Sequence, residues 1–238
     1  MATTITGTTI DVGTNVIVTD SAGNVGIGIS SPAEMLEIYN TSSPAIQLND
    51  GGDYKSIMRL AGNDLEIRGS SGSLEFYNGA ADGDSSDLAM KIDNAGIVTK
   101  PLQPAFCVKA NIQNNMALNS WQHILFANEI FDQNQDYASN TFTAPVTGKY
   151  QLQVSVRLDT IDSSTSYYQV RIATSNRAYH TICAMDRMSG DPSYWNFNIA
   201  VLADMDAGDT CQIQFIQAGG SQQTDIDGES YFSGYLVA

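Results

Sequence analysis

The chain has 238 residues, of which 42% are hydrophobic, and 26 acidic against 11 basic residues give it a net charge of −15. That hydrophobic content is ordinary for a folded domain and excludes wholesale disorder. The acidic balance repels phosphate backbones and anionic head groups, so we expect no binding to nucleic acid and no membrane association. No stretch has the length of a membrane span or a signal peptide, and three widely spaced cysteines favour synthesis in a reducing cytoplasm without disulfides.

Residues 1–20 are rich in Thr, Val and Ile, and residues 21–100 are a series of short segments in which apolar and polar side chains alternate. The strands predicted from these segments are 45–48, 57–60, 65–68, 74–77 and 90–92. One helical turn is expected at 31–34, where Ser31 caps, Pro32 takes the first helical position and Glu34 closes a capping box. Strands so short bury little apolar surface in one copy, so we expect them to pair with identical chains around an axis.

A turn motif occurs twice in this first part of the chain. Residues 20–32 and 90–101 each contain the pattern Asp-x-Ala-Gly-x-Val, an aspartate-initiated turn that leads into a strand. Both strings resemble shaft segments of bacteriophage tail fibres and related virion appendages. The resemblance implies a trimeric β-rich shaft over residues 21–100. It also implies that residues 1–20 form an attachment segment that binds another virion protein.

Aromatic residues mark a boundary near residue 100. The first hundred residues hold four of the 21 aromatic residues, and the others follow. Because aromatic side chains dominate core burial, we expect a self-sufficient globule over residues 105–238, preceded by a proline-containing extended linker at 101–104. Clean alternation over residues 150–158 predicts the longest strand of the globule, and residues 168–172 and 197–201 show the same pattern.

Three patterns in this globule belong together. Residues 142–150 read FTAPVTGKY, Gly208-Asp209 precedes an apolar strand, and residues 231–236 read YFSGYL. They resemble the trimeric jelly-roll head shared by complement C1q and tumour-necrosis-factor proteins. The resemblance implies an all-β sandwich that self-assembles around a threefold axis and acts as a binding module. The side chains expected in the subunit core or the trimer interface are Phe126, Phe142, Tyr150, Phe215, Phe232 and Tyr235.

The loop at residues 185–195 provides the candidates for receptor contact. It combines Arg, Tyr and Trp, the residue types enriched at interface hot spots, and loops held by a rigid sandwich commonly carry binding sites. The candidate receptor-binding residues are Arg187, Met188, Tyr194, Trp195 and, outside the loop, Tyr167. The alternative is that Tyr194 and Trp195, which lead straight into an alternating strand, belong to the trimer core.

Calcium is the one inorganic ligand that the residue types suggest, and no other cofactor is expected. The two candidate clusters are Asp225, Asp227 and Glu229, and Asp82, Asp84 and Asp87. Acidic oxygens at this density can hold calcium, and the alternative is a solvated acidic turn.

Catalysis has no motif to support it, because His123 and His180 lie in no nucleophile or zinc pattern. Together with the fibre resemblance, this predicts a structural virion fibre of a bacteriophage and not an enzyme. The fibre is expected to be a homotrimer, attached by its N-terminus, with the head outward and bound to a receptor on the host cell surface. The alternative is a protein that decorates the capsid or tail and stabilises the particle without receptor binding. In either case the chain is made in the host cytoplasm and located in the virion.

Overall fold

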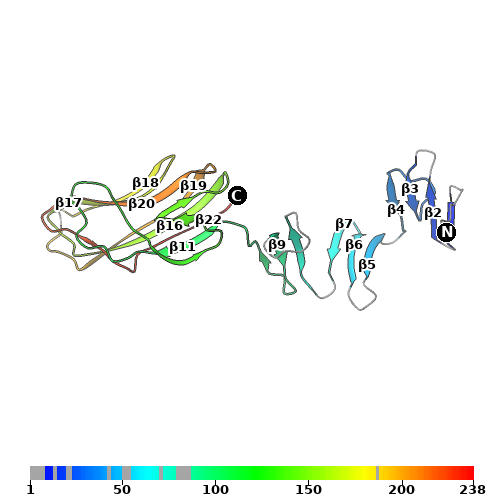
Figure 1. Ribbon diagram of the computed structural model, residues 1–238, viewed down its shortest axis with the longest axis horizontal. Helices are drawn as coiled ribbons and strands as arrows, with labels where there is room; N and C mark the ends of the chain where they lie inside the picture. Colours follow the sequence, from blue (N-terminus) through cyan, green and yellow to red (C-terminus); the bar gives the residue numbers. More distant parts are fainter. Residues whose placement is uncertain are drawn as a thin grey trace. The chain divides into compact units, whose positions relative to one another are not determined.

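The computed structural model describes residues 9–12, 15–19, 23–41, 44–49, 55–69, 72–78, 87–185 and 188–238. The chain divides into two compact units, Met1–Thr99 and Lys100–Ala238. Both units are built of β-strands, and the described residues contain no α-helix (Figure 1). The all-β class expected from the sequence is therefore confirmed. In the part of the chain that the structure describes, no helix is long and apolar enough to cross a membrane.

The described residues of the N-terminal unit form three small sheets. The strands are β1 (Thr9–Val12), β2 (Asn15–Thr19), β3 (Val25–Ile27), β4 (Leu36–Ile38), β5 (Ala45–Asn49), β6 (Lys55–Ala61), β7 (Asp64–Arg68), β8 (Leu74–Tyr77), β9 (Leu88–Ile92) and β10 (Val98–Thr99). The sheets have the orders β1-β2-β3-β4, β5-β6-β7 and β10-β9-β8. Apolar side chains such as Leu48, Leu65 and Ile67 remain exposed on them. The predicted strands are confirmed, and a single copy leaves much of their apolar surface open to water.

The helical turn expected at 31–34 is wrong. Strand β4 pairs with β3 in parallel, so the chain must cross back to the starting end of β3 before β4 begins. The backbone N–H of Val25 donates to the carbonyl of Met35 at 2.8 Å, and the N–H of Ala33 donates to Glu37 Oε2 at 2.7 Å. The crossing therefore takes its hydrogen bonds from a neighbouring strand and from Glu37, and not from a helical turn capped by Ser31.

The repeated turn is visible in full at its second copy. Asp93 Oδ1 accepts hydrogen bonds from the backbone N–H groups of Ala95 and Ile97, both at 2.9 Å. Gly96 has a φ of 83°, and the equivalent Gly23 has a φ of 88°, so both occupy the left-handed region that favours glycine. In both copies a strand begins within two residues of this glycine, which explains the shared pattern.

The linker predicted at residues 101–104 is not an extended connector. The N–H of Gln103 closes a turn on the carbonyl of Lys100 at 3.1 Å. Gln133 Nε2 donates to the carbonyls of Lys100 and Gln103 at 3.0 and 2.7 Å, and Asn134 Nδ2 donates to that of Leu102 at 2.8 Å. Amide side chains from a later loop thus satisfy the backbone acceptors of this segment and hold it against the second unit.

The second unit, which we call the head, is a sandwich of two antiparallel sheets (Figure 1). Sheet one has the order β13-β11-β22-β16-β19, with β21 beside β16, and sheet two has the order β14-β15-β20-β17-β18, with β12 beside β20. The strands are β11 (Ala105–Lys109), β12 (Gln122–His123), β13 (Asn128–Asp132), β14 (Tyr137–Ala138), β15 (Thr141–Thr143), β16 (Gly148–Asp159), β17 (Thr165–Thr174), β18 (Ala178–Ala184), β19 (Tyr194–Met205), β20 (Thr210–Gly219), β21 (Asp225–Ile226) and β22 (Tyr231–Leu236).

Aromatic rings fill the space between the two sheets. The Phe106 ring stacks on Phe142 and on Tyr137, with centroids 4.7 and 5.2 Å apart, and meets Phe232 edge-on at 4.9 Å. These four residues come from β11, β15, β14 and β22, so the cluster joins both sheets. Alternate residues of β16 extend the core, since every second side chain from Tyr150 onward is fully buried.

Two of the sequence patterns meet in space at one end of the head. The N–H of Ala144 donates to the carbonyl of Asp209, and the N–H of Gly208 donates to the carbonyl of Ala144, both at 2.8 Å. The Tyr150 hydroxyl donates to the carbonyl of Val146 at 2.7 Å. The turn before β16 and the turn before β20 are therefore one hydrogen-bonded unit.

Replacing Gly234 with alanine should destabilise the head by about 1–3 kcal/mol, because overpacking a filled core costs that much. A Cβ at this position would lie 2.8 Å from both Leu152 Cδ2 and Phe106 Cε1. Gly190→Ala is the matched control, since a Cβ there meets nothing within 4 Å. Denaturant unfolding of the two variants beside the wild type measures the difference. Equal stability of both variants would contradict the close approach at Gly234.

Candidate functional site

The outward face of sheet one carries large exposed apolar side chains on β19 and β22, and Lys109 of β11 pairs opposite one of them, Tyr231. Leu202 on β19 and Tyr235 on β22 are 55% and 53% exposed. Both pair with Gln151 of β16, so they flank it on one row of the sheet. Tyr231 lies two pairs further along β22, opposite Ser155. We call Leu202, Tyr231 and Tyr235 with the small residues between them the assembly face, because large apolar groups exposed together mark interaction surfaces.

The structure separates the six residues predicted for the core or the trimer interface. Phe126, Phe142, Tyr150, Phe215 and Phe232 are fully buried inside the sandwich, whereas Tyr235 lies on the assembly face. Sequence reasoning missed Leu202 and Tyr231. In both strands buried and exposed residues alternate, and Leu202 and Tyr231 fall on exposed positions. A large apolar residue at a position that the alternation turns outward could have identified them from the sequence.

Loops gather at the end of the sandwich opposite the one where the chain enters. The chain enters beside the C-terminus, where the N–H of Leu236 donates to the carbonyl of Pro104 at 3.0 Å. Strand β16 runs from that end to Asp159 over 12 residues, a span of roughly 40 Å. Residues 160–164 follow β16 and residues 188–193 precede β19, and we call these two segments the tip loops. Ser163 joins them, since its N–H and hydroxyl donate to Asp191 Oδ1 at 2.8 and 2.5 Å.

A buried carboxylate fixes the tip loops. Asp162 is buried, and its Oδ1 accepts hydrogen bonds from the N–H and the hydroxyl of Ser164. Its Oδ2 accepts from the N–H groups of Ser221 and Gln222 at 2.6 and 2.8 Å. Burial acts to raise the pKa of Asp162, but the hydrogen bonds from Ser164, Gln222 and Ser221 outweigh it and lower that pKa to about 2.

Neutral buried groups continue this network. The Tyr168 hydroxyl lies 2.7 Å from Thr224 Oγ1, and the N–H of Asp162 donates to the same hydroxyl at 2.9 Å. Gln217 Nε2 donates to Thr165 Oγ1 at 3.0 Å, and Gln217 Oε1 accepts from the N–H of Thr224 at 3.1 Å. Because the members of a buried network satisfy one another, the tip loops have a defined conformation.

The candidate receptor-binding residues do not form one cluster. Arg187 lies outside the described residues, and Met188 lies on a tip loop with its N–H donated to the carbonyl of Met185. Tyr167 is half-buried on β17 of sheet two, whereas Tyr194 and Trp195 begin β19 of sheet one. Tyr194 is 59% exposed with Arg157 Cζ 5.5 Å from its ring centroid, and Trp195 packs against the core.

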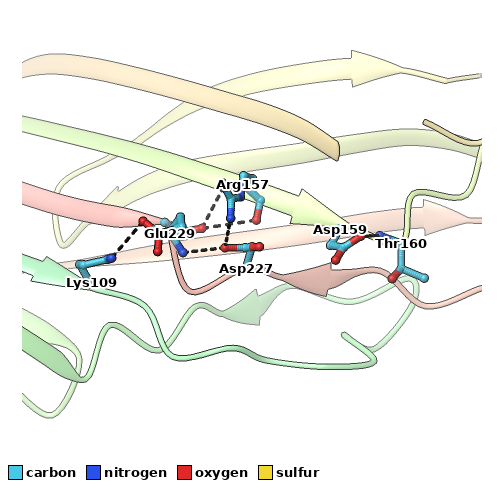
Figure 2. A network of polar contacts seen from close by, with 7 residues as sticks. Lys109, Arg157, Asp159, Thr160, Asp227 and Glu229 are labelled. Carbon is cyan, nitrogen blue, oxygen red and sulfur yellow. Dashed lines mark hydrogen bonds and ion pairs between the residues drawn. The ribbon is translucent and has the colours of Figure 1, made fainter. Parts of the chain in front are cut away.

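In the acidic turn at residues 225–229, other groups of the protein contact the carboxylates predicted to hold calcium. Arg157 Nη2 lies 2.7 Å from Asp227 Oδ1, and Lys109 Nζ lies 3.1 Å from Glu229 Oε2, as Figure 2 shows. Asp225 accepts instead from the N–H of Asn115 and from a threonine hydroxyl. Burial raises the pKa of Asp227, but hydrogen bonds from Arg157 and the backbone of Glu229 lower it more.

Each of these acids has its own protein partner, an arrangement that favours the alternative of an acidic turn over the predicted calcium site. Of the second cluster, Asp82 and Asp84 lie outside the described residues. Within the ranges that the structure describes, no three His, Cys, Asp or Glu side chains come together as a metal would require.

The two-sheet head corresponds to a known protein family. Residues 105–237 match the C1q domain. The chain belongs to the C1q-domain family. The predicted resemblance to complement C1q and tumour-necrosis-factor heads is therefore confirmed, and the matched region begins at the first residue of β11. C1q domains form homotrimers and are non-enzymatic binding modules.

Two solved structures are similar to this chain at low sequence identity. The globular domain of zebrafish complement 1qA is 17% identical, with a TM-score of 0.43, over 57% of this chain and 98% of that one. Murine APRIL at pH 8.0 is 12% identical, with a TM-score of 0.42, over 57% of this chain and 99% of that one. No curated protein matches the chain.

Replacing Asp162 with asparagine should destabilise the C1q head by about 2 kcal/mol near neutral pH, because hydrogen bonds to a charged acceptor are lost. The pKa of Asp162 lies below its ordinary 3.8 in the folded state, at about 2. Its stabilisation is therefore present above pH 4 and is lost as the pH falls from about 4 to about 2. Unfolding of wild type and variant at pH 7 and pH 3 measures the effect.

The difference between wild type and Asp162→Asn should be smaller at pH 3 than at pH 7. Glu129→Gln, a change at an exposed acid of β13, is the control that should leave stability unaltered at both values. A gap that stays constant with pH would show that the charge of Asp162 is not what holds the tip loops.

Proposed function

We propose that this chain is a homotrimeric bacteriophage fibre protein whose C1q head recognises a ligand on the host cell surface. The observation that carries the proposal is the assembly face, a set of exposed Tyr and Leu side chains on one sheet of a C1q domain. The family forms homotrimers, and such a face gives this chain the apolar surface that an interface between copies needs.

The chemistry of the assembly face suits close contact around an axis. Ser233 and Ala200 both pair with Gln153 at the middle of the sheet, so small and uncharged side chains lie between Leu202 and Tyr235 and the more distant Tyr231. The row Leu202–Gln151–Tyr235 contains no charge, and Lys109 opposite Tyr231 is paired with Glu229 at 3.1 Å, so contact along that row avoids the cost of desolvating an unpaired charge.

The exposed apolar side chains of the N-terminal unit support the same assembly. Its strands have two to seven residues, and side chains such as Leu48 and Leu65 remain open to water. Small sheets of this kind need a partner for stability, and copies of the same chain provide one. In this proposal residues 1–20 attach the fibre to another virion protein, in line with the tail-fibre resemblance of residues 20–32.

The tip loops are the part of the head proposed to face the host. They lie at the end of the sandwich away from Pro104, where the chain enters the head. The network around Asp162 keeps them in one conformation, and a preformed surface loses less entropy on binding. Three copies on one trimer would also act together, so weak single sites could give strong attachment.

Leu202→Asp should convert the trimer to monomers, because it would bring three unpaired charges to the threefold interface. Ile182→Asp is the matched control: Ile182 is 60% exposed, similar to Leu202 at 55%, but lies on sheet two. Light scattering of the purified full-length proteins gives the oligomeric state. A wild type that is monomeric at micromolar concentration would refute the trimer, and a trimeric Leu202→Asp would place its interface elsewhere.

Excess purified full-length protein, added to susceptible cells before infection, should compete with phage particles for adsorption. The Leu202→Asp monomer should compete less well, because it lacks the effective concentration of a trimer. Counting adsorbed particles measures both effects. Unchanged adsorption, together with particles that lack the protein and are infectious but fragile, would instead support the role of a capsid or tail decoration.

A further inference from the structure

The outward face of sheet two differs in charge from the rest of the chain. None of the 26 acidic residues lies in its six strands, β12, β14, β15, β17, β18 and β20. The same strands contain both histidines of the chain, His123 and His180, together with Arg171. In a protein of net charge −15, this sheet is a local exception. Because charges more than about 8 Å away are largely screened at physiological ionic strength, the local balance governs what binds there.

A stacked pair of side chains marks the centre of this face. The Cζ atom of Arg171 lies 3.9 Å from the ring centroid of Trp121, and Arg171 Nε donates to Gln214 Oε1 at 2.6 Å. The His180 ring meets Trp121 edge-on, with centroids 5.9 Å apart. A guanidinium held by stacking and by a hydrogen bond at Nε keeps its fork in a fixed orientation.

Arg171 is unlike the other described arginines of the head. Arg157 pairs with Asp227 at 2.7 Å and Arg177 pairs with Asp204 at 2.9 Å. Arg171 makes no ion pair with any acid in the described part of the chain. A cation ordered by neutral neighbours keeps its charge available for an anionic partner.

Neutral donors surround this cation. Gln169 Nε2 lies 3.0 Å from His180 Nδ1, and Gln214 Nε2 lies 3.4 Å from His123 Nε2. An amide nitrogen can only donate, so in the neutral rings these imidazole nitrogens accept and the other nitrogen of each ring carries the proton. The face therefore offers ring N–H donors on both sides of the guanidinium, which suits a ligand rich in hydroxyl and carboxylate oxygens.

We propose that this face, which we call the Arg171 face, binds an acidic polysaccharide whose uronate carboxylate lies on the Arg171 guanidinium. A forked guanidinium matches a planar carboxylate, and the histidine N–H groups match sugar hydroxyls. A single arginine is too few for tracking a phosphate backbone. The inference rests on the proposed recognition function and names the ligand class of the head.

Calorimetry of the full-length protein with three probes tests the assignment. Tetragalacturonate should bind at least about tenfold more tightly than the neutral maltotetraose and than tripolyphosphate, since only it combines sugar hydroxyls with carboxylates. Arg171→Gln should weaken tetragalacturonate binding by about tenfold or more, the scale of a lost charge-assisted contact. Arg177→Gln, which changes an exposed arginine paired with Asp204, is the matched control and should leave the affinity unaltered.

Thermal unfolding and light scattering establish that each variant is folded and retains the wild-type oligomeric state. If Arg171→Gln fails to fold, His180→Ala, a change at an exposed side chain, replaces it and should also weaken tetragalacturonate binding. Equal binding of tripolyphosphate would reduce the site to a general anion patch, and equal binding of maltotetraose would remove the role of the charge. Either result, or no binding of tetragalacturonate, overturns the inference.

The adsorption experiment separates this inference from the proposed function. Protein that competes for adsorption but binds no tetragalacturonate leaves the recognition function standing and removes the Arg171 face as its site. Protein that binds tetragalacturonate through Arg171 but does not compete supports the site and counts against host attachment. Failure in both measurements overturns both proposals.

Discussion

The packing of aromatic rings around Phe106 is the interaction on which the head depends. Its contacts with Phe142 and Phe232, at centroid distances of 4.7 and 4.9 Å, join strands of both sheets. Once these rings point inward, the alternation of each strand decides which residues point outward. The close fit also explains Gly234, where any side chain would meet Phe106 and Leu152. The inward orientation of these rings therefore fixes both the core and the residues of the outer surfaces.

The outer faces of the two sheets differ in chemistry. Sheet one presents Leu202 and Tyr235 on either side of the neutral Gln151, which suits contact between copies. Sheet two presents Arg171 stacked on Trp121, with no acid in any of its strands, which suits a polar and anionic ligand. A trimer that uses the first face leaves the second available, so assembly and recognition need not compete for surface.

The N-terminal unit, in contrast to the packed head, leaves many apolar side chains exposed to water. It has three small sheets and exposed apolar side chains, with salt bridges such as Lys91–Glu75 at 2.9 Å on its surface. Surface pairs of this kind contribute little stability, so burial of apolar area between copies has to supply most of it. In the proposed assembly both units would gain from association, the head through one face and the N-terminal unit through the exposed apolar side chains of its described sheets.

The sequence by itself determined the features that depend on local pattern: the strands with alternating residues, the turns at Asp93 and Gly208, and the limits of the C1q domain. These follow from side-chain period and turn chemistry, which need no knowledge of distant residues. The sequence also predicted the buried aromatic residues of the core, but it did not show that Tyr235 lies on the outer surface. Only the tertiary structure decided that Arg157 neutralises Asp227, 70 positions away, and that Arg171 stacks on Trp121. Such partners are set by strand order and register, because residues far apart in the chain become neighbours only after the sheets have formed.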